Sequence, residues 1–169
     1  APFTFSVLTD KLDVGLHPAI RILPLRHPWT GWWSKIEMFA PGLWADGRVW
    51  YFDLDTILVG NITEMVTDPS LGDDFYTLRD FGFKDRLASG VMTWKVGDPA
   101  VSEIYNQFAL KPEAIMSSCC TLGDQCWVGI ANTSRNFLQD KYPGKFVSFK
   151  MHCSDGRCIQ QGASVVAFH

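Results

Sequence analysis

The sequence predicts an α/β domain in which helices flank a mixed sheet. Short apolar runs typical of strands alternate along the chain with stretches of helical periodicity. Of the 169 residues, 47% are apolar, which is sufficient for a chain of this length to bury a core. No linker-like stretch interrupts the pattern, so we expect residues 1–169 to form a single domain.

The strands are predicted by apolar runs. The strongest run is VWYFDL at residues 49–54, because continuous apolar and aromatic side chains are typical of a sheet covered on both faces. Weaker runs predict further strands at residues 3–8, 20–25, 75–78, 91–94 and 165–168.

The clearest helix begins at Asp98, an N-cap residue type that is followed by Pro99 at the first helical position. The apolar residues after it are spaced i, i+3, i+4 and i+7, which places them on one helix face: Val101, Ile104, Tyr105 and Phe108. We expect further helices at residues 31–39 and at residues 123–130.

Composition argues against some classes of function. A net charge of −3 disfavours general nucleic-acid binding, which needs a basic face. No apolar run approaches the roughly 20 residues that span a membrane. We also expect no signal peptide, and we expect a cytoplasmic protein. Both ends fall beside apolar runs rather than polar tails, which we interpret as truncation at both ends.

The cysteines indicate reduced thiols. Because their number, 5, is odd, the cysteines cannot all pair within one chain, and no two of them have the CxxC spacing of a structural zinc site. The alternative is a small disulfide between Cys153 and Cys158, which flank the turn-like segment SDGR.

Two acids stand at the end of the strongest predicted strand. Asp53 and Asp55 are two residues apart, a spacing that points both side chains to one face. Open α/β sheets bind ligands at the edge where strands end, and paired carboxylates suit Mg²⁺ or Mn²⁺, particularly when a diphosphate completes the coordination shell. The alternative is one capping Asp beside an exposed turn Asp.

Around these acids the sequence resembles the GT-A glycosyltransferases. Residues 51–62 (YFDLDTILVGNI) resemble the D-x-D segment of that fold, and family 8 and glycogenin-type enzymes are the most similar. Four other segments resemble motifs of the family, and they occur in the family's order along the chain: WSKIE at 33–37, ASGVM at 88–92, GDQ at 123–125 and VVAFH at 165–169. The resemblance implies a GT-A-like, Rossmann-like mixed sheet flanked by helices.

The resemblance also implies roles for individual residues. Asp53, Asp55 and His169 would hold Mn²⁺ or Mg²⁺ against the diphosphate of a nucleotide-sugar donor, and Asp53 would also contact the donor. The remaining donor contacts would come from Thr9, Asp10, Lys35, Ser89 and Gly90. Asp124 and Gln125 are the implied catalytic residues near the anomeric carbon.

The reaction implied is retaining transfer of a hexose, from a donor that is most often UDP-linked, to a carbohydrate, lipid or protein acceptor that the sequence does not name. Two other interpretations stay open. D-x-D-x-T also fits a haloacid-dehalogenase-type phosphatase, with Asp53 as nucleophile, Asp55 as general acid/base and Mg²⁺ as cofactor. The third interpretation is a non-catalytic, sugar-binding remnant of the GT-A fold.

Each candidate residue has a simpler structural alternative. Lys35 fits a solvated helix charge, Asp124 fits an N-cap, and Ser89–Gly90 fits a turn before a strand. The tryptophans near the motifs, Trp32, Trp33 and Trp50, are expected in the core rather than as stacking surfaces for sugars.

Overall fold

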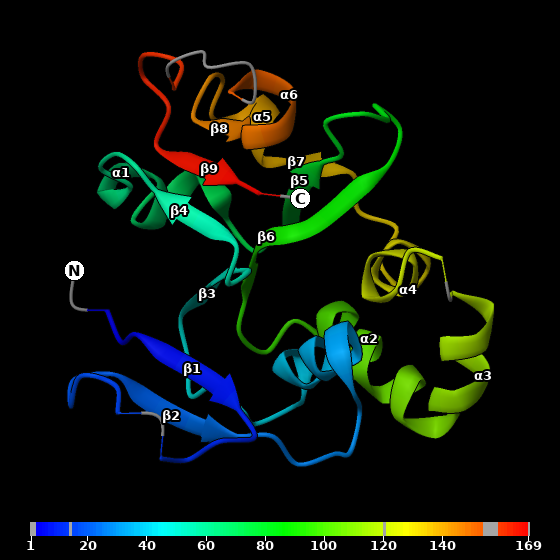
Figure 1. The fold of residues 1–169 in the computed structure, drawn as a ribbon. Coiled ribbons are helices and arrows are strands. Elements are labelled where there is room, and N and C mark those ends of the chain that lie inside the picture. Colours follow the sequence, from blue (N-terminus) through cyan, green and yellow to red (C-terminus); the bar gives the residue numbers. More distant parts are fainter. Residues whose placement is uncertain (1–2, 14, 120, 154–158, 169) are drawn as a thin grey trace.

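The computed structural model describes residues 3–13, 15–119, 121–153 and 159–168. Within these ranges the chain is a mixed α/β structure with open sheets flanked by helices, as the sequence predicts (Figure 1). The strands are β1 Ser6–Thr9, β2 Arg21–Pro24, β3 Arg48–Phe52, β4 Thr56–Leu58, β5 Tyr76–Arg79, β6 Leu87–Lys95, β7 Asn136–Phe137, β8 Phe146–Ser148 and β9 Val165–Ala167. The helices are η1 Gly31–Phe39, α1 Thr63–Val66, η2 Pro69–Leu71, α2 Pro99–Leu110, α3 Pro112–Ser118, α4 Asp124–Ala131, α5 Leu138–Lys141 and α6 Phe149–His152.

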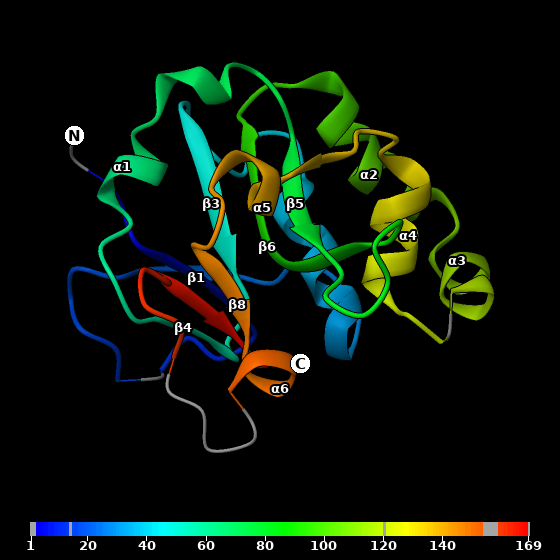
Figure 2. The ribbon, with the colours of Figure 1, turned by 90° about the horizontal axis from the view of Figure 1, so that it is seen from above.

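The described strands form three sheets. The central sheet has the order β3-β6-β5-β7, a smaller one has the order β4-β9-β8, and β1 pairs with β2 in parallel. In Figure 2 the central sheet stands between the helices η1, α2 and α4 on one side and the β4-β9-β8 sheet on the other. The chain passes directly from β3 into β4, so this connection joins the central sheet to the smaller one.

Alternating side chains of β3 face two separate apolar clusters. Val49 and Tyr51 pack against the cluster on the helix side, which contains η1, α2 and α4 residues. Trp50 and Phe52 pack against the second cluster, which β8 and β9 help to form. Because side chains alternate along a strand, the residue after Phe52 continues the face of Tyr51, toward the helices.

The helix side is centred on the buried ring of Phe108. This ring packs against Trp29 (centroids 4.7 Å apart), Trp33 (5.4 Å) and Trp127 (6.3 Å), so it joins α2 to η1 and α4. The helix α2 has the predicted N-cap, since Asp98 accepts a hydrogen bond from the Ala100 amide. No helix in the described ranges is long and apolar enough to cross a membrane.

Several elements differ from the sequence predictions. Residues 31–39 form a 3-10 helix. The run at 49–54 ends as a strand at Phe52, and β3 is an edge strand of its sheet. Apolar clusters lie on both of its faces, as predicted, but its residues are only half-buried. The short strands β4, β7 and β8 carry no signal that we recognised in the sequence. Cys153 is a buried free thiol, and Cys158 lies outside the described residues.

Phe108→Ala is expected to lower the free energy of unfolding by about 3–5 kcal/mol, because it removes a fully buried ring that joins three helices. Leu110→Ala on the same helix is the control, since Leu110 is 83% exposed and its truncation changes stability by about 0.5 kcal/mol or less. Urea unfolding measures both. Equal losses in the two variants would contradict the assignment of Phe108 as the centre of this cluster.

Candidate active site

The two acids of the D-x-D segment lie in the turn that joins β3 to β4. The Thr56 amide donates a hydrogen bond to the Asp53 carbonyl (3.0 Å), which closes the turn after the strand has ended at Phe52. Leu54 is fully exposed at the tip of this turn. Asp53 and Asp55 therefore flank an exposed tip at the junction of two sheets, as expected for a strand that gives way to a loop.

The pairing of β6 with β3 places Ser89 and Gly90 next to this turn, and a register shift on the β5 side of the same residues forms a bulge. The pairing of β5 with β6 shifts between Thr77, which pairs with Met92, and Leu78, which pairs with Ala88. Ser89 and Gly90 lie in the part of β6 that this shift leaves without partners on β5. Bulges of this kind bend a strand and redirect its side chains. The Gly90 carbonyl accepts a hydrogen bond from the Asp53 amide (2.8 Å), which fixes the bulge against the turn.

The ammonium group of Lys35 is the centre of the site. Its Nζ atom lies 2.9 Å from Oδ1 of Asp53, 3.1 Å from Oδ2 of Asp124 and 3.3 Å from Oγ of Ser89. The Ser89 hydroxyl donates to the same Asp124 oxygen (2.7 Å). The Lys35 side chain is only 10% exposed and that of Asp124 only 7%. Lys35 is thus a largely buried, paired cation rather than a solvated helix charge.

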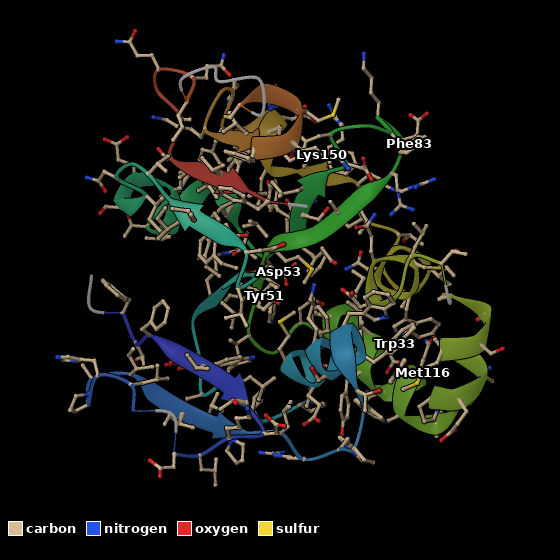
Figure 3. The ribbon with its side chains drawn as sticks, viewed as in Figure 1. Trp33, Tyr51, Asp53, Phe83, Met116 and Lys150 are labelled. Atoms are coloured by element: carbon tan, nitrogen blue, oxygen red, sulfur yellow. The ribbon has the colours of Figure 1, made fainter. Side chains whose placement is uncertain are left out.

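Tyr51 belongs to the same cluster and was not among the predicted site residues. Its hydroxyl donates a hydrogen bond to Oδ1 of Asp53, and Figure 3 shows the two residues side by side. The ring of Tyr51 also lies 5.4 Å from the Lys35 ammonium. Burial, together with the charge of Asp53 and the hydrogen bond to it, raises the pKa of Tyr51 well above its usual value. The hydroxyl therefore stays a donor at neutral pH. The i, i+2 spacing of Tyr51 and Asp53 is the signal that predicts their shared face.

Asp124 is held at the start of α4 by the backbone before it. The N-cap position belongs to Gly123, so the Asp124 carboxylate does not cap the helix and pairs with Lys35 and Ser89 instead. Gly123 has φ +58°, a conformation that favours glycine. A Cβ atom there would lie 2.4 Å from Nε1 of Trp32, so the indole covers this glycine closely.

The tryptophans of the region divide by exposure. Trp33 is buried in the helix-side cluster, as predicted. Trp50 packs against the second cluster and stacks on Phe52. Trp32, in contrast, is 55% exposed, which the sequence did not predict. Trp32 and Lys35 are three residues apart in a 3-10 helix, a spacing that places side chains on one face.

Other predicted site residues lie outside the Lys35 cluster. Asp55 is exposed, and its carbonyl accepts a hydrogen bond from the Phe168 amide (3.0 Å), where the pairing of β4 with β9 continues. Thr9 and Asp10 lie at the end of β1, where the Thr9 hydroxyl accepts from the Lys11 amide. His169 falls outside the described residues. Gln125 is half-buried and lines a neighbouring cavity.

The described residues do not form a metal site made of protein groups alone. No group of three or more His, Cys, Asp or Glu residues within the described ranges is placed to hold an ion. The Asp53 carboxylate is paired with Lys35, and that of Asp55 is exposed. These hard oxygen donors fit a Mg²⁺ or Mn²⁺ ion that takes most of its ligands from elsewhere, such as the oxygens of a bound diphosphate.

Comparison with known proteins shows the fold. No protein-family model matches the chain, and a search of curated proteins finds no significant relative. Among solved structures, the glycosyltransferase GlyE of Streptococcus pneumoniae TIGR4 matches with a TM-score of 0.64 and 16% identity over 89% of this chain. The apo form of GlyE matches with a TM-score of 0.56 and 15% identity over 89%. The chain covers 41% and 40% of those two structures, respectively, and it has a glycosyltransferase-type fold over that part.

Proposed function

We propose that this domain transfers a sugar from a nucleotide-diphosphate donor, UDP-linked, as a family 8 or glycogenin-like glycosyltransferase. The observation that carries the proposal is the placement of Lys35 between Asp53 and Asp124, beside the bulge at Ser89. A paired cation next to a D-x-D turn is suited to a diphosphate, and the likeness to a glycosyltransferase fold supports the same assignment.

In this proposal the donor lies along the sheet edge. Thr9 and Asp10 at the end of β1 contact the nucleotide, while Ser89 and Gly90 line the sugar pocket. Asp53, Asp55 and His169 would hold Mn²⁺ or Mg²⁺. The metal, when bound, supplies positive charge that screens the diphosphate and stabilises it as a leaving group.

The chemistry assigned to the chain's own residues is electrostatic. When the bond between the anomeric carbon and the diphosphate oxygen breaks, its electron pair leaves with the diphosphate, and the Lys35 ammonium stabilises that negative charge. The Asp124 carboxylate stabilises the positive charge that develops at the anomeric carbon, and Gln125 orients sugar hydroxyls. An acceptor hydroxyl oxygen then bonds to that carbon on the face from which the diphosphate departs, and its proton passes to an oxygen of the departing diphosphate, so that configuration is retained.

Tyr51 is a positioning residue in this scheme. Its hydroxyl stays protonated and donates to Oδ1 of Asp53, so it fixes the carboxylate beside Lys35. Because Asp124 also pairs with Lys35, the ammonium is oriented before a donor arrives. Such preorganisation avoids rearranging charged groups during the reaction.

Asp55→Asn is expected to abolish the thermal stabilisation that UDP with Mn²⁺ gives to the chain, because it removes one proposed metal ligand. The variant should keep the fold, since the residue is exposed and only its backbone makes a described hydrogen bond. Asp46→Asn, at another exposed position, is the matched control and should retain the shift. Differential scanning fluorimetry measures the three proteins.

This thermal shift, together with a phosphatase assay and a titration with free sugars, separates the alternatives. A shift that survives in Asp55→Asn would refute the metal assignment. Phosphate release from p-nitrophenyl phosphate with Mg²⁺, without any response to UDP, would instead favour the phosphatase. Stabilisation by free sugars alone, with no response to UDP and Mn²⁺, would favour the sugar-binding remnant.

Lys35→Met is expected to lower the free energy of unfolding by about 3 kcal/mol at neutral pH, because it leaves the buried Asp124 carboxylate without its cation. It should also reduce UDP-sugar hydrolysis by about a hundredfold or more, at a temperature where the variant is folded. Lys11→Met, at an exposed position, is the control for loss of one positive charge. Urea unfolding and coupled UDP-release assays give the two readouts; unchanged hydrolysis would remove Lys35 from the mechanism.

A further inference from the structure

A cavity of about 590 Å³ adjoins the candidate active site on the side of α4. It is formed by the loop between β5 and β6, by the face of α4 that carries Gln125, and by Arg135 beyond that helix. Figure 3 shows Phe83 on this loop, at the edge of the molecule. The volume of the cavity lies within the range of about 300–1,000 Å³ typical of ligand sites.

The lining of the cavity is positively charged. Lys84, Arg86 and Arg135 contribute three cations, against the single acid Asp85. In the part of the chain that the structure describes, none of these four side chains forms an ion pair. The Arg135 guanidinium donates only to backbone carbonyls at the end of α4, so its charge has no carboxylate partner there. The cavity therefore favours an anionic ligand.

The guanidinium of Arg86 lies over an aromatic ring. It lies 4.3 Å from the ring centroid of Phe83. Stacking of this kind keeps the planar guanidinium ordered while its N–H groups stay available for a carboxylate or phosphate. Phe83 is 61% exposed and Leu122 is 41% exposed, so the rim also offers apolar surface to the carbon-bearing face of a sugar ring.

The cavity begins close to the site where transfer is proposed. Gln125, which lines it, directly follows Asp124. Leu87 also lines it and precedes Ser89 by two residues on β6, a separation of about 7 Å at the usual rise of a strand. Two of the residues that line the cavity are therefore close in sequence to Asp124 and Ser89, which belong to the Lys35 cluster.

We propose that this cavity binds the acceptor, and that the acceptor is a sugar carrying a phosphate or carboxylate group. The acceptor role rests on the proposed function. Arg86 and Lys84 bind the anionic group, Phe83 packs against the sugar ring, and Gln125 lies between the acceptor and the transferred sugar.

The test is a set of NMR titrations with matched ligands and variants. Glucose 6-phosphate and glucuronate carry the two anionic groups, and glucose is the uncharged control; all are added in the presence of UDP and Mn²⁺, which occupy the proposed donor site. Arg86→Gln removes the stacked cation but keeps its backbone hydrogen bonds, whereas Arg21→Gln removes one exposed cation on β2. The expected result is binding of an anionic sugar about tenfold tighter than glucose, a five- to tenfold loss in Arg86→Gln, and no loss in Arg21→Gln.

Either anionic sugar alone can give this pattern, and the one that does identifies the group recognised. Equal binding of glucose and both anionic sugars, or equal affinities in Arg86→Gln and Arg21→Gln, overturns the proposal. Thermal stabilisation of the unmodified chain by UDP and Mn²⁺ reports separately on the donor site. If that response is missing while Arg86 still governs binding of the anionic sugar, the proposed transferase function fails, and the acceptor role with it, but the anion site stands.

Discussion

The candidate site depends on one buried cation shared by two carboxylates. Lys35 on η1 pairs with Asp53 after β3 and with Asp124 on α4, so a single ammonium joins three elements that are distant in sequence. Removing such groups from water is unfavourable unless each charge is paired and hydrogen-bonded. Ser89 meets that requirement from a fourth element, because its hydroxyl contacts both the ammonium and Asp124. The cluster therefore holds the site in one arrangement.

The packing of the sheet explains why the cluster forms on the helix side. Because side chains alternate along β3, those of Val49 and Tyr51 face η1, α2 and α4. Asp53 continues that face into the turn. The pairing of β6 with β3 then places Ser89 beside the acid. Phe108 and the surrounding tryptophans fix η1 against α2 and α4, which sets the position of Lys35 relative to Asp124.

Much of this layout could be predicted from the sequence, and the remainder depends on contacts that no local pattern encodes. The long amphipathic helix α2 and the apolar run of β3 carry their own signals. The strands β4, β7 and β8 have only two or three residues each, too few for periodicity, and they exist because a partner strand is present. The D-x-D spacing marked Asp53 and Asp55 as candidate site residues, but the pairing of Lys35 with Asp124 joins residues that only the tertiary fold brings together.

The positions of Ser89 and Trp32 likewise depend on tertiary contacts that the local sequence does not show. Ser89 resembles a turn residue in sequence, and its role follows from the pairing of β6 with β3, which depends on both strands. Trp32 and Trp33 are neighbours of equal hydrophobicity, yet one is 55% exposed and the other 7%. Their difference arises because the tertiary packing of η1 buries one side of this helix against α2 and leaves Trp32 over Gly123.

The hydrogen bond from Phe168 to Asp55 has a consequence for how the molecule assembles. It continues the pairing of β4 with β9, so the acidic turn is anchored by a strand more than a hundred residues further along the chain. Closing so large a loop lowers the conformational entropy of the chain before the new contact stabilises it. Contacts between residues so distant in sequence are therefore slow to form. The turn is thus expected to reach its final geometry late in folding, after the aromatic cluster around α2 has already condensed.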